Sequence, residues 1–111
     1  METIHVFILN PAAGHSDITN ELKESISALC RELQLDFVIL TTLHPGHASQ
    51  LCSEFAASHP DSVCRFYSCG GDGTLNEVVT GAMDHENAQV ACFACGTGND
   101  YIKIFDRPDY R

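Results

Sequence analysis

Hydrophobic residues form four short runs that are typical of β-strands. The runs cover residues 4–9, 36–41, 63–68 and 89–93. The first two are almost continuously apolar, which is typical of parallel strands whose two faces are both covered by helices. We therefore expect these runs to be strands of one buried sheet.

Between the runs, apolar residues recur at helical spacing. In residues 17–33 the steps between them are 4, 4, 3 and 4, which puts them on one face of a helix. These residues are Ile18, Leu22, Ile26, Leu29 and Leu33. Similar patterns predict helices over residues 47–59 and 74–83. Residues 101–105 are interpreted as the opening of another helix, which Pro108 stops.

Alternating strands and helices predict an α/β fold, a three-layer Rossmann-like parallel sheet with helices on both faces. Right-handed crossovers keep the strands parallel, so each loop from strand to helix emerges at the carboxyl edge of the sheet. Four loops meet there, at residues 10–16, 42–46, 70–73 and 94–99. Candidate functional residues are therefore sought in these loops.

Length and charge narrow the possible partners. The 111 residues predict one domain, and 6 Lys and Arg against 15 Asp and Glu give a net charge of −9. Because few positive charges can meet phosphates, nucleic-acid binding and lasting contact with an anionic membrane are disfavoured. No apolar run reaches the ~20 residues of a membrane helix. We expect a cytoplasmic protein with only transient membrane contact.

Cysteines and histidines do not form a metal-binding pattern. The six cysteines fall inside apolar strand or helix patterns, where reduced Cys acts as a small hydrophobe. Cys92 and Cys95 form a C-x-x-C, but no second pair or matching histidines follow at the spacing of a zinc site. The six histidines are scattered, and surface or loop positions are expected for them.

The strongest functional signal is the Gly-Gly-Asp-Gly-Thr sequence at residues 70–74, between a predicted strand and a predicted helix. Glycines let the backbone approach a ligand, and the free N–H groups of a helix start favour anions, so this loop predicts a phosphate cradle. It is neither a Walker A loop nor G-x-G-x-x-G. A structural alternative treats Thr74 and Glu77 as a capping box, but it leaves the three glycines unexplained.

Two further loops strengthen this interpretation. Residues 95–100 read Cys-Gly-Thr-Gly-Asn-Asp, and residues 10–14 read Asn-Pro-Ala-Ala-Gly. The ordered motifs N-P-x-x-G, G-G-D-G-T-L-N-E and G-T-G-N-D resemble the catalytic domain of the diacylglycerol kinase family. That family of lipid kinases also includes the sphingosine kinases and the bacterial YegS-like enzymes. The resemblance covers residues 4–105, nearly the whole chain.

The resemblance implies the phosphofructokinase and NAD kinase-like form of the fold. It also implies transfer of the γ-phosphoryl group of ATP, bound with Mg²⁺, to a lipid hydroxyl such as that of diacylglycerol. Asp72 is the loop carboxylate assigned to phosphate and Mg²⁺ positioning, and it is the catalytic candidate within the chain. The nucleotide-binding residues that the resemblance implies are Asn10, Thr42, Gly70, Gly71, Asp72, Gly73, Thr74, Asn76 and Thr97.

Family members continue into a β-rich domain that supplies the general base and much of the lipid pocket. The resemblance therefore implies that residues 1–111 are the N-terminal nucleotide-binding domain without that β-rich domain, with little or no turnover alone. The amphipathic lipid alcohol would bind through the absent domain, and self-association through an exposed patch is expected. His15, His47 and Ala94 depart from the family pattern, and His15 weakens the fixed positive charge beside the phosphates.

Two alternatives remain open. An NAD kinase-like enzyme shares the Gly-Gly-Asp-Gly-Thr loop and the sheet, but not N-P-x-x-G in the first loop. A non-catalytic nucleotide-binding module would keep the fold after losing its partner domain.

Overall fold

The computed structural model describes residues 2–11, 16–69, 72–94 and 101–105. The elements follow in the order β1 (Glu2–Leu9), α1 (Ser16–Glu32), β2 (Phe37–Thr41), α2 (His47–Ser58), β3 (Ser62–Cys69), α3 (Asp72–Ala82), β4 (Ala88–Ala94) and β5 (Tyr101–Phe105). The four predicted strands and three of the predicted helices are confirmed, with ends that shift by about two residues or fewer.

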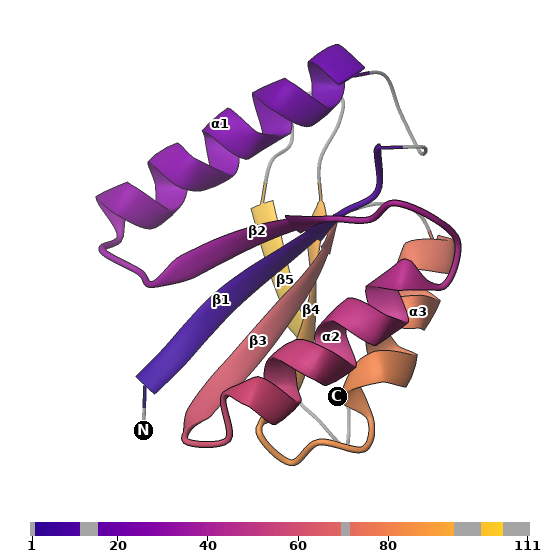
Figure 1. The fold of residues 1–111 in the computed structure, drawn as a ribbon. Helices are drawn as coiled ribbons and strands as arrows, with labels where there is room; N and C mark the ends of the chain where they lie inside the picture. The colour runs from indigo at the N-terminus through magenta and orange to yellow at the C-terminus, as the bar shows by residue number, and fades with distance from the viewer. Residues whose placement is uncertain (1, 12–15, 70–71, 95–100, 106–111) are drawn as a thin grey trace.

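The strands form one sheet in the order β2-β1-β3-β4-β5 (Figure 1). β1 pairs in parallel with β2 and with β3, and β3 pairs in parallel with β4. The carboxyl ends of these four strands therefore share one edge of the sheet. The predicted α/β fold with a parallel sheet is confirmed.

Helices cover both faces of the sheet, as the sequence predicted. α1 lies on one face, and α2 and α3 lie side by side on the other (Figure 1). The core under α1 contains Phe7, Leu9, Ile26, Cys30, Tyr67, Cys69 and Ala91. The core under α2 and α3 contains Val6, Ile8, Ala48, Cys52, Ala56, Cys64, Phe66, Val78, Ala82, Ala88 and Val90. Alternate residues of β1 and β3 thus face opposite cores.

Two helices on the same face approach closely because Gly81 has no side chain. A Cβ at Gly81 would overlap the carbonyl oxygen of Ser49 and lie 3.0 Å from the Cβ of Cys52. Any larger residue at this position would push α3 away from α2. Gly81 therefore fixes the distance between the two helices whose N-termini reach the carboxyl edge of the sheet.

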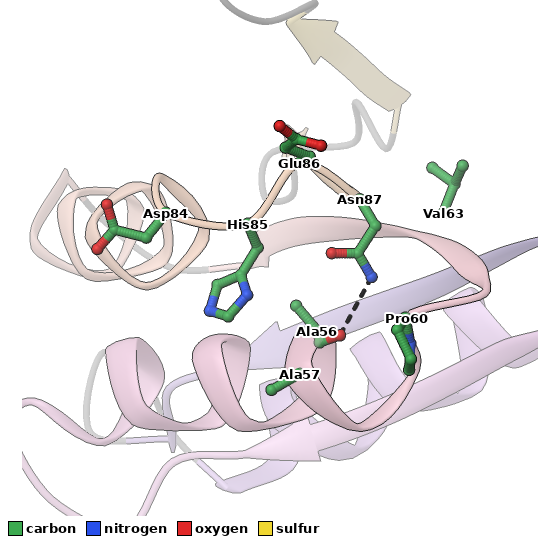
Figure 2. A pocket seen from close by; sticks show the side chains of 8 residues that line it. All are labelled: Ala56, Ala57, Pro60, Val63, Asp84, His85, Glu86 and Asn87. Atoms are coloured by element: carbon green, nitrogen blue, oxygen red, sulfur yellow. Dashed lines mark hydrogen bonds between the residues drawn. The ribbon is translucent and has the colours of Figure 1, made fainter.

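Asn87 holds the opposite end of the same two helices. Its side-chain amide donates to the carbonyl oxygens of Ala56 at 3.1 Å, His59 at 2.9 Å and Ser62 at 3.1 Å. The Ala56 bond is drawn in Figure 2. Ala56 lies at the end of α2, His59 is its C-cap and Ser62 opens β3. The carbonyls of Ala56 and His59 also accept from the backbone N–H groups of His59 and Ser62, so the Asn87 amide adds a second donor to each and ties the end of α2 to the start of β3.

The prediction of a helix at residues 101–105 is wrong. These residues form β5, which pairs antiparallel with β4 in a register that places Ala91 opposite Ile104. The sequence Tyr-Ile-Lys-Ile-Phe is rich in β-branched and aromatic residues, which favour strands. A five-residue apolar run does not distinguish a helix start from a strand, and here pairing with β4 decides the outcome.

The capping-box interpretation of Thr74 and Glu77 is also wrong. α3 begins at Asp72, so Thr74 lies within its first turn and is not the cap. The Glu77 carboxylate accepts a hydrogen bond from the backbone N–H of Ala48 in α2 at 3.3 Å. The Glu77 carboxylate therefore bonds to the backbone of α2, whereas a capping box would have bonded it to the backbone N–H of Thr74.

The expectation of surface positions fails for one histidine. His5 lies in β1 and is only 8% exposed, and its Nδ1 lies 2.7 Å from the hydroxyl of Tyr67. Burial and the nearby Arg65 charge lower the pKa of His5.

The expectation for cysteines holds for Cys30, Cys52, Cys64 and Cys69, which are buried and form no disulfide. Within the described ranges, no helix combines the length and the apolar character that crossing a bilayer requires.

Candidate functional site

The strand order places a topological switch point between β1 and β3. β1 is followed in sequence by a crossover to β2 on one side, whereas β3 and β4 extend the sheet on the other. In open α/β sheets, ligands bind outside the carboxyl ends of the strands at such a point. The residues that follow β1 and β3 are Asn10 and the start of α3, two of the segments selected from the sequence.

Asn10 and Thr74 meet at this point although 64 residues separate them. The side-chain amide of Asn10 donates to the Thr74 hydroxyl at 3.3 Å, in a partly buried position. Thr74 itself is only 5% exposed. The contact joins the N-P-x-x-G motif to the first turn of α3, so two of the motifs belong to one site.

Thr42 lies beside the same edge. Its backbone N–H donates to the carbonyl of Leu9 at 2.8 Å, which continues the pairing with β1 one residue beyond the end of β2. The Thr42 residue is buried, at 8% exposure. Because Asn10 directly follows Leu9, the first and second loops are neighbours.

The N-terminus of α3 is open at Gly73. No described atom lies within 4 Å of the position that a Cβ on Gly73 would take. Gly73 is exposed and has helical backbone, so neither packing nor a positive φ requires a glycine there. Glycine in a helix costs about 1 kcal/mol relative to alanine. The open space at Gly73 leaves room for a ligand to approach the backbone.

The N-terminus of α2 is different, because a carboxylate from the protein already occupies it. Glu77 accepts the Ala48 N–H of the first turn at 3.3 Å. A negative charge at a helix N-terminus interacts favourably with the free N–H groups and would repel a second anion. In the described residues, a carboxylate from another helix thus occupies the start of α2.

Two histidine rings stack in the loop between Thr42 and α2. The rings of His44 and His47 have centroids 4.5 Å apart. The backbone N–H of Leu43 donates to Nδ1 of His47 at 2.9 Å, and Gly46 takes a φ of +83° before the helix. His47, where the family pattern has an acidic residue, thus holds the turn of its own loop.

Several predicted site residues are only partly covered by the structure. Gly70, Gly71 and Thr97 lie outside the described residues. Asp72 is the first residue of α3, and Asn76 is exposed one turn further along the helix. Among the predicted residues, the described contacts bring together Asn10 and Thr74 by a direct hydrogen bond, with Thr42 beside them.

One polar residue of this region was missed from the sequence. Ser68 is 3% exposed, and its hydroxyl has no hydrogen-bond partner in the described part of the chain. Ser68 lies two residues before the glycine loop, inside a run that was interpreted only as a strand. A serine in an otherwise apolar strand is the signal that would have drawn attention to it.

No group of three metal-ligating side chains occurs within the described ranges. A cavity of about 520 Å³ lies elsewhere, at the amino edge of the sheet between the end of α2 and the turn before β4 (Figure 2). Pro60, Val63 and Asn87 are among its lining residues. It is separated from the switch point by the length of the strands.

Comparisons with known proteins agree with the motifs. Residues 5–109 match the family described as the diacylglycerol kinase catalytic domain. The protein named "Putative lipid kinase YtlR" of Bacillus subtilis (strain 168) is 31% identical over 99 residues, which cover 89% of this chain and 32% of that protein. "Putative lipid kinase SERP0390" of Staphylococcus epidermidis is 30% identical over 112 residues, which cover 96% of this chain and 35% of that protein.

Solved structures show the same likeness. A crystal structure of a diacylglycerol kinase from Bacillus anthracis str. Sterne matches with a TM-score of 0.63 and 31% identity, over 88% of this chain and 35% of that chain. The de novo designed Rossmann fold protein ROS2_835 matches with a TM-score of 0.51 at 13% identity, which supports the fold alone. The chain spans about a third of the length of the curated relatives it matches.

Proposed function

Because the chain belongs to the diacylglycerol kinase catalytic-domain family, we propose that it binds ATP with Mg²⁺ for transfer of the γ-phosphoryl group to a lipid hydroxyl, such as that of diacylglycerol. Membership of this family removes the NAD kinase-like alternative. The non-catalytic module remains as an outcome of the binding and transfer experiment below.

The observation that carries the proposal is the hydrogen bond between Asn10 and Thr74 at the switch point. It joins two of the family motifs at a helix N-terminus whose backbone is open at Gly73. Free N–H groups at such a terminus bind phosphate oxygens. We assign the nucleotide phosphates to the start of α3, with Asn10 and Thr42 beside them.

Phosphoryl transfer depends mainly on positioning and on stabilising negative charge. In this proposal the first turn of α3 holds the phosphates by its backbone, and Asn10 orients them from the adjacent strand end. Thr97 and the glycines before α3 complete the contacts. Asp72 would hold Mg²⁺, which when bound neutralises charge on the phosphate oxygens.

We further propose that the chain is the nucleotide-binding part of the kinase. Its matched relatives are about three times as long as the matched part. The general base and the pocket for the amphipathic lipid would then lie in the remaining, β-rich part. In this proposal the 111-residue chain binds nucleotide but transfers little phosphate by itself.

The experiment is a comparison of binding and transfer in the purified chain. Isothermal titration with MgATP tests binding, and incubation with γ-labelled ATP and diacylglycerol in mixed micelles tests transfer. We expect saturable binding with little labelled lipid. Absence of MgATP binding would contradict the proposed function. Binding without transfer after the chain is joined to the remaining part of a relative would favour the non-catalytic module.

A further inference from the structure

The buried hydroxyl of Ser68 is the one polar side-chain atom of the described residues that is both enclosed and unpartnered. Leaving such a group without a hydrogen bond destabilises the folded protein relative to a state in which the bond is made. Alanine would fill nearly the same space without that cost. Within the described part of the chain, no contact therefore explains a hydroxyl at this position.

Ser68 lies beneath the phosphate site proposed above. It is one residue from the carboxyl end of β3, and the strand register places it between Ile8 of β1 and Cys92 of β4. Side chains alternate along a strand, so Ser68 shares a face with Phe66, which packs in the core under α2 and α3. The hydroxyl thus faces the layer that contains α3.

The other polar groups on this face are close in the fold. Asn10 lies two residues after Ile8, just past the end of the strand next to Ser68, and it donates to Thr74 in the first turn of α3. Below this level the face is apolar, formed by residues such as Val6 and Phe66. Ser68, Asn10 and Thr74 therefore form a thin polar layer between the apolar core and the start of α3.

We propose that Ser68 is a positioning residue for the phosphate site, and that its hydroxyl gains its missing hydrogen bond when an anion occupies the N-terminus of α3. An anion draws the Asn10 amide and the first turn of α3 toward itself, because both carry N–H donors. A small shift of this kind brings Asn10 or Thr74 within reach of Ser68. The inference rests on the proposed function.

This arrangement links nucleotide binding to the hydrogen bonding of the Ser68 hydroxyl in the polar layer. The unbound state contains an unsatisfied hydroxyl, and the bound state does not. A ligand that binds more tightly to the state in which Ser68 is hydrogen-bonded shifts the population toward that state. The size of the shift is set by the difference in affinity between the two states. Removing the hydroxyl should therefore affect the free and bound proteins in opposite directions.

The test compares the unsubstituted chain with Ser68→Ala and Ser68→Thr. Thermal unfolding without ligand measures the stability of the free protein, and isothermal titration with MgATP and with inorganic triphosphate measures binding. We expect Ser68→Ala to unfold at a higher temperature than the unsubstituted chain and to bind both ligands about three- to tenfold more weakly. Ser68→Thr keeps the hydroxyl and should retain most of the affinity.

The matched control is Ser58→Ala, at an exposed position at the end of α2. It should leave the affinity for both ligands unchanged. If the unsubstituted chain binds MgATP and Ser68→Ala binds it equally well, the role of Ser68 is contradicted while the proposed function stands. A lower unfolding temperature for Ser68→Ala would also contradict it, because the hydroxyl would then have a partner in the free protein. If the unsubstituted chain binds neither ligand, the proposed function itself fails, and the role of Ser68 with it.

Discussion

The side-chain amide of Asn10 donates a hydrogen bond to the hydroxyl of Thr74 at 3.3 Å, across the switch point between β1 and β3. Asn10 directly follows the first strand, and Thr74 lies in the first turn of the helix that follows β3. The contact brings together two motifs that are distant in sequence. It also makes Asn10 the most direct side-chain probe of the proposed phosphate site.

Replacing Asn10 with alanine should weaken MgATP binding about tenfold, which corresponds to about 1.4 kcal/mol, the loss of a hydrogen bond to a charged group. Isothermal titration measures the change. Thr74→Ser keeps the hydroxyl that accepts from Asn10 and serves as the matched control, with an affinity close to that of the unsubstituted chain. Equal affinity in Asn10→Ala would place the phosphates elsewhere.

Glu77→Ala should lower the free energy of unfolding by about 1 kcal/mol, because the first turn of α2 loses the acceptor for the Ala48 N–H. Glu77→Gln keeps an acceptor oxygen and should lose less. Urea unfolding followed by circular dichroism gives the values. The control is Glu54→Ala, whose carboxylate accepts from the exposed Gln50 and whose loss should cost less than about 0.5 kcal/mol. Equal losses at Glu77 and Glu54 would show that the contact between α2 and α3 has no capping role.

Most of the fold was predictable from the sequence because its signals are local. Apolar residues of α1 recur at helical spacing, and β1 and β2 contain nearly continuous apolar runs, so tertiary contacts do not change the outcome. The segment Tyr101–Phe105 was assigned wrongly because its five residues fit either structure and pairing with β4 decides. Pairing with a distant strand is not visible in a local pattern.

The site was predictable only as a set of loops. Glycine content and position after a strand selected the start of α3, and the strand order then gave the shared edge. The bonds from Asn10 to Thr74 and from Glu77 to Ala48 could not be predicted, because each joins elements that are distant in sequence. Ser68 was overlooked because a single serine does not change the pattern of a strand.

Asn87→Ala should destabilise the protein by about 1–2 kcal/mol, since the carbonyl oxygens of Ala56, His59 and Ser62 lose their shared side-chain donor. The free energy of unfolding in urea measures the loss. Asn20→Ala, at an exposed position on α1, is the control and should change stability by less than about 0.5 kcal/mol. A similar small change for Asn87→Ala would contradict the assigned role.

Acidification should destabilise the protein through His5. Burial, with the Arg65 charge as a smaller cause, lowers the pKa of His5 below its ordinary value of 6.5. As the pH falls below 6.5 the unfolded chain takes up a proton that the folded chain binds less readily, so stability is present above that pH and is lost below it.

The measurement for His5 is the free energy of unfolding between pH 7.5 and pH 5, for the unsubstituted chain and for His5→Phe. The variant keeps a ring against Tyr67 but cannot titrate, so its stability should fall less with decreasing pH. Identical pH dependence of the two proteins would show that His5 does not titrate differently in the folded and unfolded states.

The most direct test of the phosphate site at α3 is the affinity for MgATP of the unsubstituted chain and of Gly73→Ala, measured by isothermal titration beside thermal unfolding. A Cβ at Gly73 meets no described atom, so the variant should fold and gain up to about 1 kcal/mol from better helix propensity. The same Cβ would stand where the phosphates approach the backbone, so we expect MgATP binding to fall at least tenfold. A Gly73→Ala chain that binds MgATP as tightly as the unsubstituted chain would contradict the account.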